Sequence, residues 1–298
     1  MNARFSGIYC AIVTPFKDGQ LDIARFQMHV RRMIADGCDG VLVAGTTGEG
    51  PSLSIAERCQ LVSAAREVSD SLKLLAGTGC SSLPETIQVT SQAYELGADG
   101  VVIVPPFFFR NVSTQGLFEY YQTVFLEAVP ASGGAFLYHI PQVSGVPISI
   151  ELLDRLLAAV GTKLAGLKDS SGDRELLIQL CQRYPNLSIF AGLDDLLLDG
   201  LQAGAAGYIT AEANLLAAPA AAIYKAFQLG QAAQPLQDLL VEARVFLPHT
   251  SFSAAVKALL AVRYNDPAWC EVRLPLEPLA AEDQALLVEE LRRLQLFT

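Results

Sequence analysis

The sequence has little positive charge for its size. Lys and Arg number 21 against 31 Asp and Glu, which gives a net charge of −10, and no Lys/Arg-rich run occurs. Nucleic-acid-binding proteins need a basic surface, so we expect no nucleic-acid partner. Only 17% of the residues are charged and 51% are hydrophobic, which excludes a disordered chain.

The residues that usually bind metals are also sparse. The three histidines, His29, His139 and His249, lie far apart in the sequence. The six cysteines are scattered and form no C-x-x-C pair; they are Cys10, Cys38, Cys59, Cys80, Cys181 and Cys270. No spacing here is typical of a metal site, and the pattern favours free thiols in a reducing cytoplasm.

Signals for export, membrane insertion and nucleotide binding are missing as well. The first apolar run is interrupted by Pro15 and Lys17, so it does not form a signal peptide. The longest stretch without charged residues, 128–150, contains three prolines and is therefore no spanning helix. Neither G-x-G-x-x-G after a strand nor a P-loop is found. We expect a cytoplasmic protein without a membrane partner.

Short apolar runs alternate with longer amphipathic stretches along most of the chain. The runs predict eight strands, at 8–13, 40–44, 73–77, 100–104, 135–139, 163–167, 187–191 and 207–210. The stretches predict helices at 22–36, 54–69, 83–96, 114–128, 149–160, 172–183, 193–203 and 213–227. This order favours a (β/α)8 TIM barrel, with a doubly wound sheet as the alternative.

Beyond about residue 228 the strand pattern stops, and helices are predicted at 232–247, 252–264 and 281–296. We therefore expect a barrel domain over 1–228 and a C-terminal three-helix extension over 229–298. Within the barrel, Gly-x-x-Gly recurs between a helix and the next strand at 37–40, 97–100 and 204–207. Glycine after a helix suits the left-handed cap, so the repeat indicates one unit used several times.

In such a barrel, the chemistry lies where strands end at the C-terminal face. Lys168 follows the apolar run 164–167, where loss of water favours the neutral amine that Schiff-base chemistry requires. Alternatively, Lys168 leaves the sheet and pairs with Asp169 or Asp173. Tyr138 ends the neighbouring strand, about 5 Å away, and is either a proton relay for Lys168 or a core tyrosine.

The glycine-rich segment 45–49 follows the second predicted strand. Its backbone N–H groups and the hydroxyls of Thr46 and Thr47 suit a carboxylate or phosphate, although an ordinary turn has the same composition. Glu49 beside such a site would repel an anion, so we interpret it as structural. Asp194 and Asp195 precede a predicted helix and are interpreted as capping residues.

Together these segments resemble the dihydrodipicolinate synthase / N-acetylneuraminate lyase family. The resemblance rests on G-T-T-G-E at 45–49, Y-x-x-P at 138–141 and G-x-K-D at 166–169, each at its expected barrel position. The opening segment 7–16 and the segment 207–214 match too, so the resemblance spans essentially the whole chain.

The resemblance implies a class I mechanism. Lys168 would form a Schiff base with the keto carbon of pyruvate or another 2-keto acid, and Tyr138 would relay protons. Thr46 and Thr47 would hold the pyruvate carboxylate through main-chain amides and hydroxyls.

The pocket would also be lined by Gly192 and by the carbonyl region of Ile209. Members of the family use no metal and no organic cofactor, and they are usually homotetramers built as dimers of dimers. We therefore expect the same of this chain.

Four residues depart from the pattern of the true synthases. Val143 stands where those enzymes have an arginine for the second substrate's carboxylate, and Phe107 and Phe108 replace a tyrosine pair. The segment 141–146, P-x-x-S-G-V, resembles instead the sialic acid lyases and 2-keto-3-deoxy sugar acid aldolases. His139 replaces the usual Asn and lies either in the core or at the rim.

We therefore expect an aldehyde-lyase that cleaves a 2-keto-3-deoxy sugar acid or related 4-hydroxy-2-keto acid to pyruvate and an aldehyde. The alternatives are a synthase or dehydratase using the same lysine imine, or a non-catalytic keto-acid sensor. Arg110 follows the fourth predicted strand. It either binds a distal anionic group or, as we favour, is a solvated loop charge.

Overall fold

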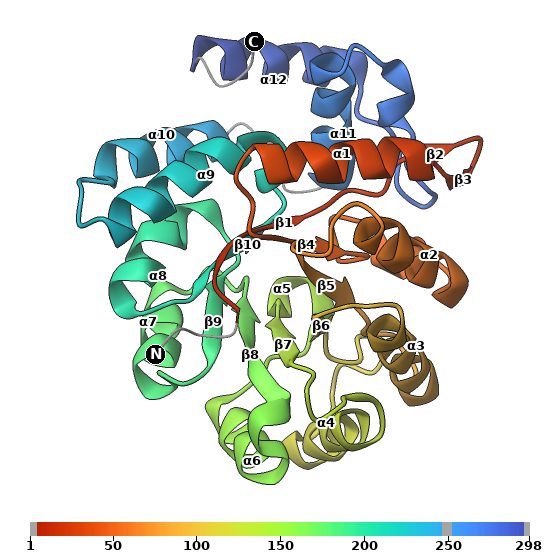
Figure 1. Cartoon of the computed structure of the whole chain (residues 1–298), viewed down its shortest axis with the longest axis vertical. Helices are drawn as coiled ribbons and strands as arrows, with labels where there is room; N and C mark the ends of the chain where they lie inside the picture. The colour runs from red at the N-terminus through yellow and green to blue at the C-terminus, as the bar shows by residue number, and fades with distance from the viewer. Residues whose placement is uncertain (1–4, 246–251, 295–298) are drawn as a thin grey trace.

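The computed structural model describes residues 5–245 and 252–294. Its centre is a closed barrel of eight parallel strands in the order β1-β10-β9-β8-β7-β6-β5-β4 (Figure 1). This confirms the predicted (β/α)8 barrel rather than a doubly wound sheet. The strands are β1 (Gly7–Ala11), β4 (Gly40–Val43), β5 (Lys73–Gly77), β6 (Gly100–Ile103), β7 (Ala135–His139), β8 (Leu164–Asp169), β9 (Ser188–Ala191) and β10 (Gly207–Thr210).

Helices surround the barrel. They are α1 (Ile23–Ala35), α2 (Ile55–Arg66), α3 (Leu83–Glu95), α4 (Thr114–Ala128), α6 (Ile150–Val160), α7 (Arg174–Arg183), α8 (Leu197–Ala203) and α9 (Ala213–Gln228). The predicted capping box is present, because Ser54 and Glu57 each bond the other's backbone N–H. Ser149 likewise caps α6 by accepting a bond from the Leu152 N–H.

Each barrel strand is buried on both faces. Large side chains such as Tyr9, Phe136 and Phe190 fill the barrel interior, and a second apolar layer lies between the strands and the helices. The recurring glycines fit this packing. Gly97 has φ +95°, and a side chain on Gly207 would lie 1.9 Å from the Gly7 carbonyl oxygen.

Three local features differ from the sequence prediction. A hairpin of β2 (Phe16–Lys17) and β3 (Gln20–Leu21) precedes α1, and its Asp-Gly turn has positive φ at both residues. A short helix α5 (Pro141–Ser144) follows β7. The predicted helix 193–203 starts as the 3-10 helix η3 (Asp194–Leu196), capped by Leu193 without a side-chain bond.

The interpretation of Asp194 and Asp195 as capping residues is therefore wrong. They lie inside η3, and Asp194 is fully buried, with its carbonyl oxygen accepting a bond from Gln237. Composition alone could not separate a cap from a first helical residue, since both positions favour aspartate.

The C-terminal helices gather at one side of the barrel, at the top of Figure 1. They are α10 (Gln234–Val245), α11 (Phe252–Arg263) and α12 (Ala281–Arg293), with the 3-10 helix η4 (Pro267–Cys270) after α11. The predicted ends at 246–247 and 295–296, and His249, lie outside the described residues. Among the helices that the structure describes, none combines the length and apolar character needed to cross a membrane.

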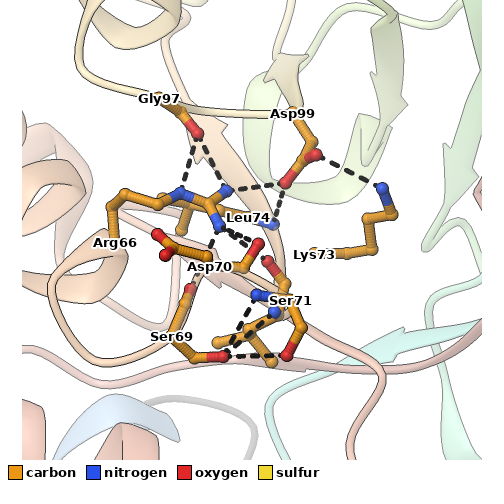
Figure 2. Close-up of polar contacts among 9 residues, drawn as sticks. Arg66, Ser69, Asp70, Ser71, Lys73, Leu74, Gly97 and Asp99 are labelled. Atoms are coloured by element: carbon orange, nitrogen blue, oxygen red, sulfur yellow. Dashed lines mark hydrogen bonds and ion pairs between the residues drawn. The ribbon is translucent and has the colours of Figure 1, made fainter.

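A polar network fixes the barrel end opposite the strand C-termini. The Arg66 guanidinium donates to the backbone carbonyls of Ser69, Asp70, Leu72 and Gly97 at 2.8–3.1 Å and pairs with Asp99 at 2.7 Å (Figure 2). The same Asp99 carboxylate accepts bonds from the Leu74 N–H and from Lys73. One arginine thus ties the end of α2 to the starts of β5 and β6.

Candidate active site

Lys168 and Tyr138 lie side by side on neighbouring strands. The register of β7 and β8 pairs the two residues, and the Lys168 Nζ lies 4.3 Å from the centroid of the Tyr138 ring. Both side chains are buried, with 4% and 6% exposure. Strand β8 continues through Asp169, two residues beyond the predicted end, so Lys168 is held by the sheet and not by a loop.

The alternative role of Lys168 as an ion-pair partner is not seen. Within the described residues, Lys168 makes no ion pair with either neighbouring aspartate. Asp169 accepts a bond from the Ser171 N–H at 3.0 Å, and Asp173 caps α7 through the Leu176 N–H at 3.0 Å. The Lys168 amine therefore faces the cavity without a carboxylate partner.

The turn after β4 brings both threonines to the same cavity. Thr46 is exposed and Thr47 is buried, and both line the cavity with Lys168 and Tyr138. The Thr46 carbonyl accepts the Glu49 N–H at 3.0 Å, and the Gly48 carbonyl accepts the Thr14 hydroxyl at 2.6 Å. A side chain at Gly48 would meet the Ile12 carbonyl at 2.8 Å, so glycine is required there.

Glu49 turns away from this cavity. Its carboxylate pairs with the Lys257 ammonium, and both side chains are fully buried. The second oxygen accepts the Arg273 N–H at 2.9 Å. Burial lowers the pKa of Lys257, while the adjacent Glu49 carboxylate acts in the opposite direction. The turn therefore presents donors to the cavity, and its one carboxylate is neutralised elsewhere.

Gly192 and Ile209 occupy different depths. Gly192 lines the cavity, and a side chain there would lie 2.7 Å from the Asp169 carbonyl oxygen, so only glycine fits. The Ile209 side chain is fully buried in the barrel interior and is not among the described residues that line the cavity.

The cavity has a volume of about 430 Å³, and part of its wall is polar. Ser170, Ser171 and Glu212 follow barrel strands, where polar site residues are expected. Gln142 and Ser253 were not expected from the sequence, because they come from α5 and α11, whose positions over the cavity depend on the fold. A second, largely carbon-lined cavity of about 220 Å³ shares Thr46, Tyr138 and Val143 with the first. Arg110 is exposed and borders this second cavity.

His139 belongs to the core rather than the rim. It is buried, and its Nδ1 accepts the Ile148 N–H at 3.0 Å, which supports the segment that follows α5. Accepting that bond requires Nδ1 to be unprotonated. Burial lowers the pKa of His139, with Asp169 opposing the shift, so the neutral form is favoured.

Of the other departures from the synthase pattern, Val143 lines both cavities and Phe107 lines the second. Val143 on α5 is 57% exposed and offers no hydrogen-bond donor. Phe108 is 75% exposed and packs edge to face against Phe109. In the part of the chain that the structure describes, no group of three or more metal-binding side chains is found, and all six cysteines are free.

This geometry agrees with a family model that matches residues 4–294, that of the dihydrodipicolinate synthetase family. The chain belongs to the dihydrodipicolinate synthetase family. An uncharacterized DapA-like lyase of Chloroflexus aurantiacus is 39% identical over 94% of each chain. A 4-hydroxy-tetrahydrodipicolinate synthase of Corynebacterium jeikeium is 33% identical over 94% of this chain and 92% of its own.

A solved member of the dihydrodipicolinate synthetase family has nearly the same architecture. YagE, a prophage protein from E. coli K12 solved in complex with pyruvate, aligns with a TM-score of 0.91 and 27% identity. The alignment covers 99% of this chain and 100% of YagE. Lyases and synthases both occur among the relatives of this chain, which is accordingly a lyase of this family.

Proposed function

We propose that this protein is a class I aldolase that cleaves a 2-keto-3-deoxy sugar acid, or a related 4-hydroxy-2-keto acid, to pyruvate and an aldehyde. The observation that carries the proposal is the buried Lys168 amine 4.3 Å from the Tyr138 ring, in a cavity that also contains Thr46 and Thr47. The pyruvate complex of YagE supports the keto-acid half of the substrate.

In this mechanism the Lys168 amine attacks the keto carbon, the Tyr138 hydroxyl gives its proton to the former keto oxygen, and water leaves, which forms an iminium ion and the Tyr138 phenolate. The Tyr138 phenolate removes the proton of the 4-hydroxyl, the bond between C3 and C4 breaks, and its electrons enter the iminium to give an enamine. The aldehyde departs, C3 takes the proton back from the Tyr138 hydroxyl, and water hydrolyses the iminium ion to release pyruvate and the Lys168 amine, with the released proton returning to the Tyr138 phenolate. Thr46 and Thr47 hold the carboxylate throughout, and no cofactor takes part.

The polar wall supports a hydroxylated substrate tail. Gln142, Ser171 and Ser253 supply amide and hydroxyl groups, which pair with sugar hydroxyls on entry. An unpaired polar group in such a pocket is unfavourable, so the wall discriminates against simple alkyl aldehydes.

The synthase reaction is the rival within the family, since several relatives are 4-hydroxy-tetrahydrodipicolinate synthases. Its aldehyde carries a carboxylate that needs a fixed cation. Val143 supplies none, and an apolar surface leaves the carboxylate's loss of water uncompensated. Phe108 has no hydroxyl for proton transfer. We therefore favour cleavage over synthesis.

Pyruvate with borohydride is the first experiment. A covalent adduct on the peptide containing Lys168 is expected, whereas label on Lys163 or Lys257 contradicts the assignment. Absence of any adduct favours a keto-acid sensor. Cleavage of a panel of 2-keto-3-deoxy acids is then compared with condensation of pyruvate and aspartate semialdehyde. Condensation faster than every cleavage reaction would overturn the aldolase proposal.

A further inference from the structure

One face of α11, in the C-terminal extension, contacts both the catalytic cavity and the turn after β4. Ser253 lines the cavity wall, and Lys257 lies four residues later, one helical turn along the same face. The Lys257 ammonium pairs with Glu49 and donates to the Glu271 carbonyl at 2.7 Å. Its Nζ also lies 4.4 Å from the centroid of the Phe16 ring.

Glu49 and Thr46 are bonded within one tight turn that also contains Thr47. The Glu49 N–H donates to the Thr46 carbonyl, and the Gly50 N–H donates to the Gly45 carbonyl at 2.9 Å. Glu49 has φ +56°, a left-handed conformation that an isolated glutamate rarely adopts, so the surroundings must hold it there. Glu49 is two residues from Thr47, so a shift of its carboxylate is transmitted to both threonines.

Stability alone does not account for this ion pair. Replacing a buried pair with apolar residues of similar volume is often neutral or stabilising, because both charges must lose their water. Here neither side chain has any exposed surface. What the pair does supply is a fixed position, because a buried carboxylate with two defined donors, Lys257 Nζ and the Arg273 N–H, has little freedom to move.

We infer that Lys257 is a positioning residue for the keto-acid carboxylate: through Glu49 it holds the Thr46–Thr47 turn in its binding geometry. The extension is then part of the active site and not an accessory to it. This inference rests on the proposed function, in which that turn grips the carboxylate. It makes Lys257, which is 208 positions from Glu49 in the sequence, responsible for the geometry of the turn that binds the carboxylate.

The test uses the full chain with the double substitution Glu49→Gln and Lys257→Met. Each single substitution leaves one buried charge without its partner and is strongly destabilising, whereas the double substitution removes both charges. The Glu49→Gln change keeps a side-chain oxygen that accepts the Arg273 N–H. The readouts are the pyruvate concentration for half-maximal borohydride trapping on Lys168, and the pyruvate-induced rise in melting temperature.

We expect the folded double variant to need at least tenfold more pyruvate for half-maximal trapping, with the saturated trapping level retained. Should the double variant not fold, Glu49→Asp keeps both charges but shortens the connection by one methylene group, and a several-fold rise is expected. The control is Arg25→Gln with Asp266→Asn. It breaks a different ion pair between the barrel and the extension, and neither residue bonds residues 46–49 in the described structure.

An unchanged half-saturation in a folded Glu49/Lys257 variant overturns the inference, as does an equal rise in the control. Failure of the proposed function has a different signature, because the wild-type protein then gains no adduct at any pyruvate concentration. In that case the rise in melting temperature with pyruvate still reports how firmly the turn holds a carboxylate. The variant and the wild type are then compared by that measure.

Discussion

At the scale of single residues, the Tyr138 hydroxyl is the decisive group for carbon–carbon cleavage. We expect Tyr138→Phe to keep the fold and to slow turnover by roughly 10²–10⁴-fold, the usual contribution of a positioned acid–base group. Trapping of pyruvate on Lys168 should fall much less. The matched control is Tyr121→Phe, a buried tyrosine whose hydroxyl bonds the Ile103 carbonyl away from the cavity. Near-normal cleavage by Tyr138→Phe would remove it from the mechanism.

A second prediction at the residue scale concerns Val143, the residue that we expect to favour cleavage over condensation with aspartate semialdehyde. We expect Val143→Arg to raise kcat/KM for condensation with aspartate semialdehyde roughly 10- to 100-fold, since a charged hydrogen bond contributes about 1.5–3 kcal/mol. The exposed position tolerates the longer side chain. Val143→Met controls for length without charge. Equal rates for the arginine and methionine variants would show that a missing cation is not the reason for weak synthase activity.

Among the elements, the end of α2 depends on Arg66. Its planar fork reaches four backbone carbonyls and Asp99 at once, which the single ammonium of lysine cannot do (Figure 2). We expect Arg66→Lys to lower the free energy of unfolding by about 1–3 kcal/mol in urea denaturation, and to leave pyruvate trapping unchanged.

Lys73→Gln is the control in the same network, because its side chain is 45% exposed and makes only a 3.3 Å contact with Asp99. The decrease in the free energy of unfolding caused by Lys73→Gln should stay below about 0.5 kcal/mol. Equal decreases in the free energy of unfolding for Lys73→Gln and Arg66→Lys would contradict a special role of the several N–H donors of the Arg66 guanidinium at this end of the barrel.

For the whole molecule, a buried histidine links stability to pH. His29 is fully buried between Asn214 and Tyr264, and burial lowers its pKa to about 4. Below about pH 6.5 the unfolded chain binds a proton at His29 that the folded chain does not, so stability falls as the pH falls toward 4. The total loss from this residue is about 3 kcal/mol.

Urea denaturation between pH 7 and pH 4.5 measures this effect. His29→Gln removes the titrating group, so the fall in the free energy of unfolding should be shallower than in the wild type. His139, whose pKa is also lowered, contributes in the same direction and remains in the variant. Identical pH dependence in both proteins would show that His29 is not the group responsible.

Assembly is the other property of the whole molecule. We predict a homotetramer, as is usual in this family. Phe108 and Phe109 form an apolar pair with 75% and 70% exposure, and apolar surface of this kind is typical of a face that a partner covers. Light scattering at micromolar concentration should therefore give four times the mass of the chain, and the mass of a single chain would contradict the prediction.

The alternation of strands and helices was predictable from the sequence, because each element depends on local periodicity and on local caps such as Ser54. The meeting of Tyr138 and Lys168 followed from it, since parallel neighbours in a barrel align their C-terminal ends. The hairpin, α5 and the true position of Asp194 did not follow, because turn residues and helix starts share the same composition.

What only the tertiary structure decided is how remote segments complete the cavity. The Glu49–Lys257 pair joins residues 208 positions apart, and Ser253 enters the cavity wall from the same helix. Sequence periodicity indicates that α11 is a helix with an apolar face, but it does not indicate which surface that face covers. That depends on the path of the chain after the barrel closes, and so the role of the extension was decided by packing.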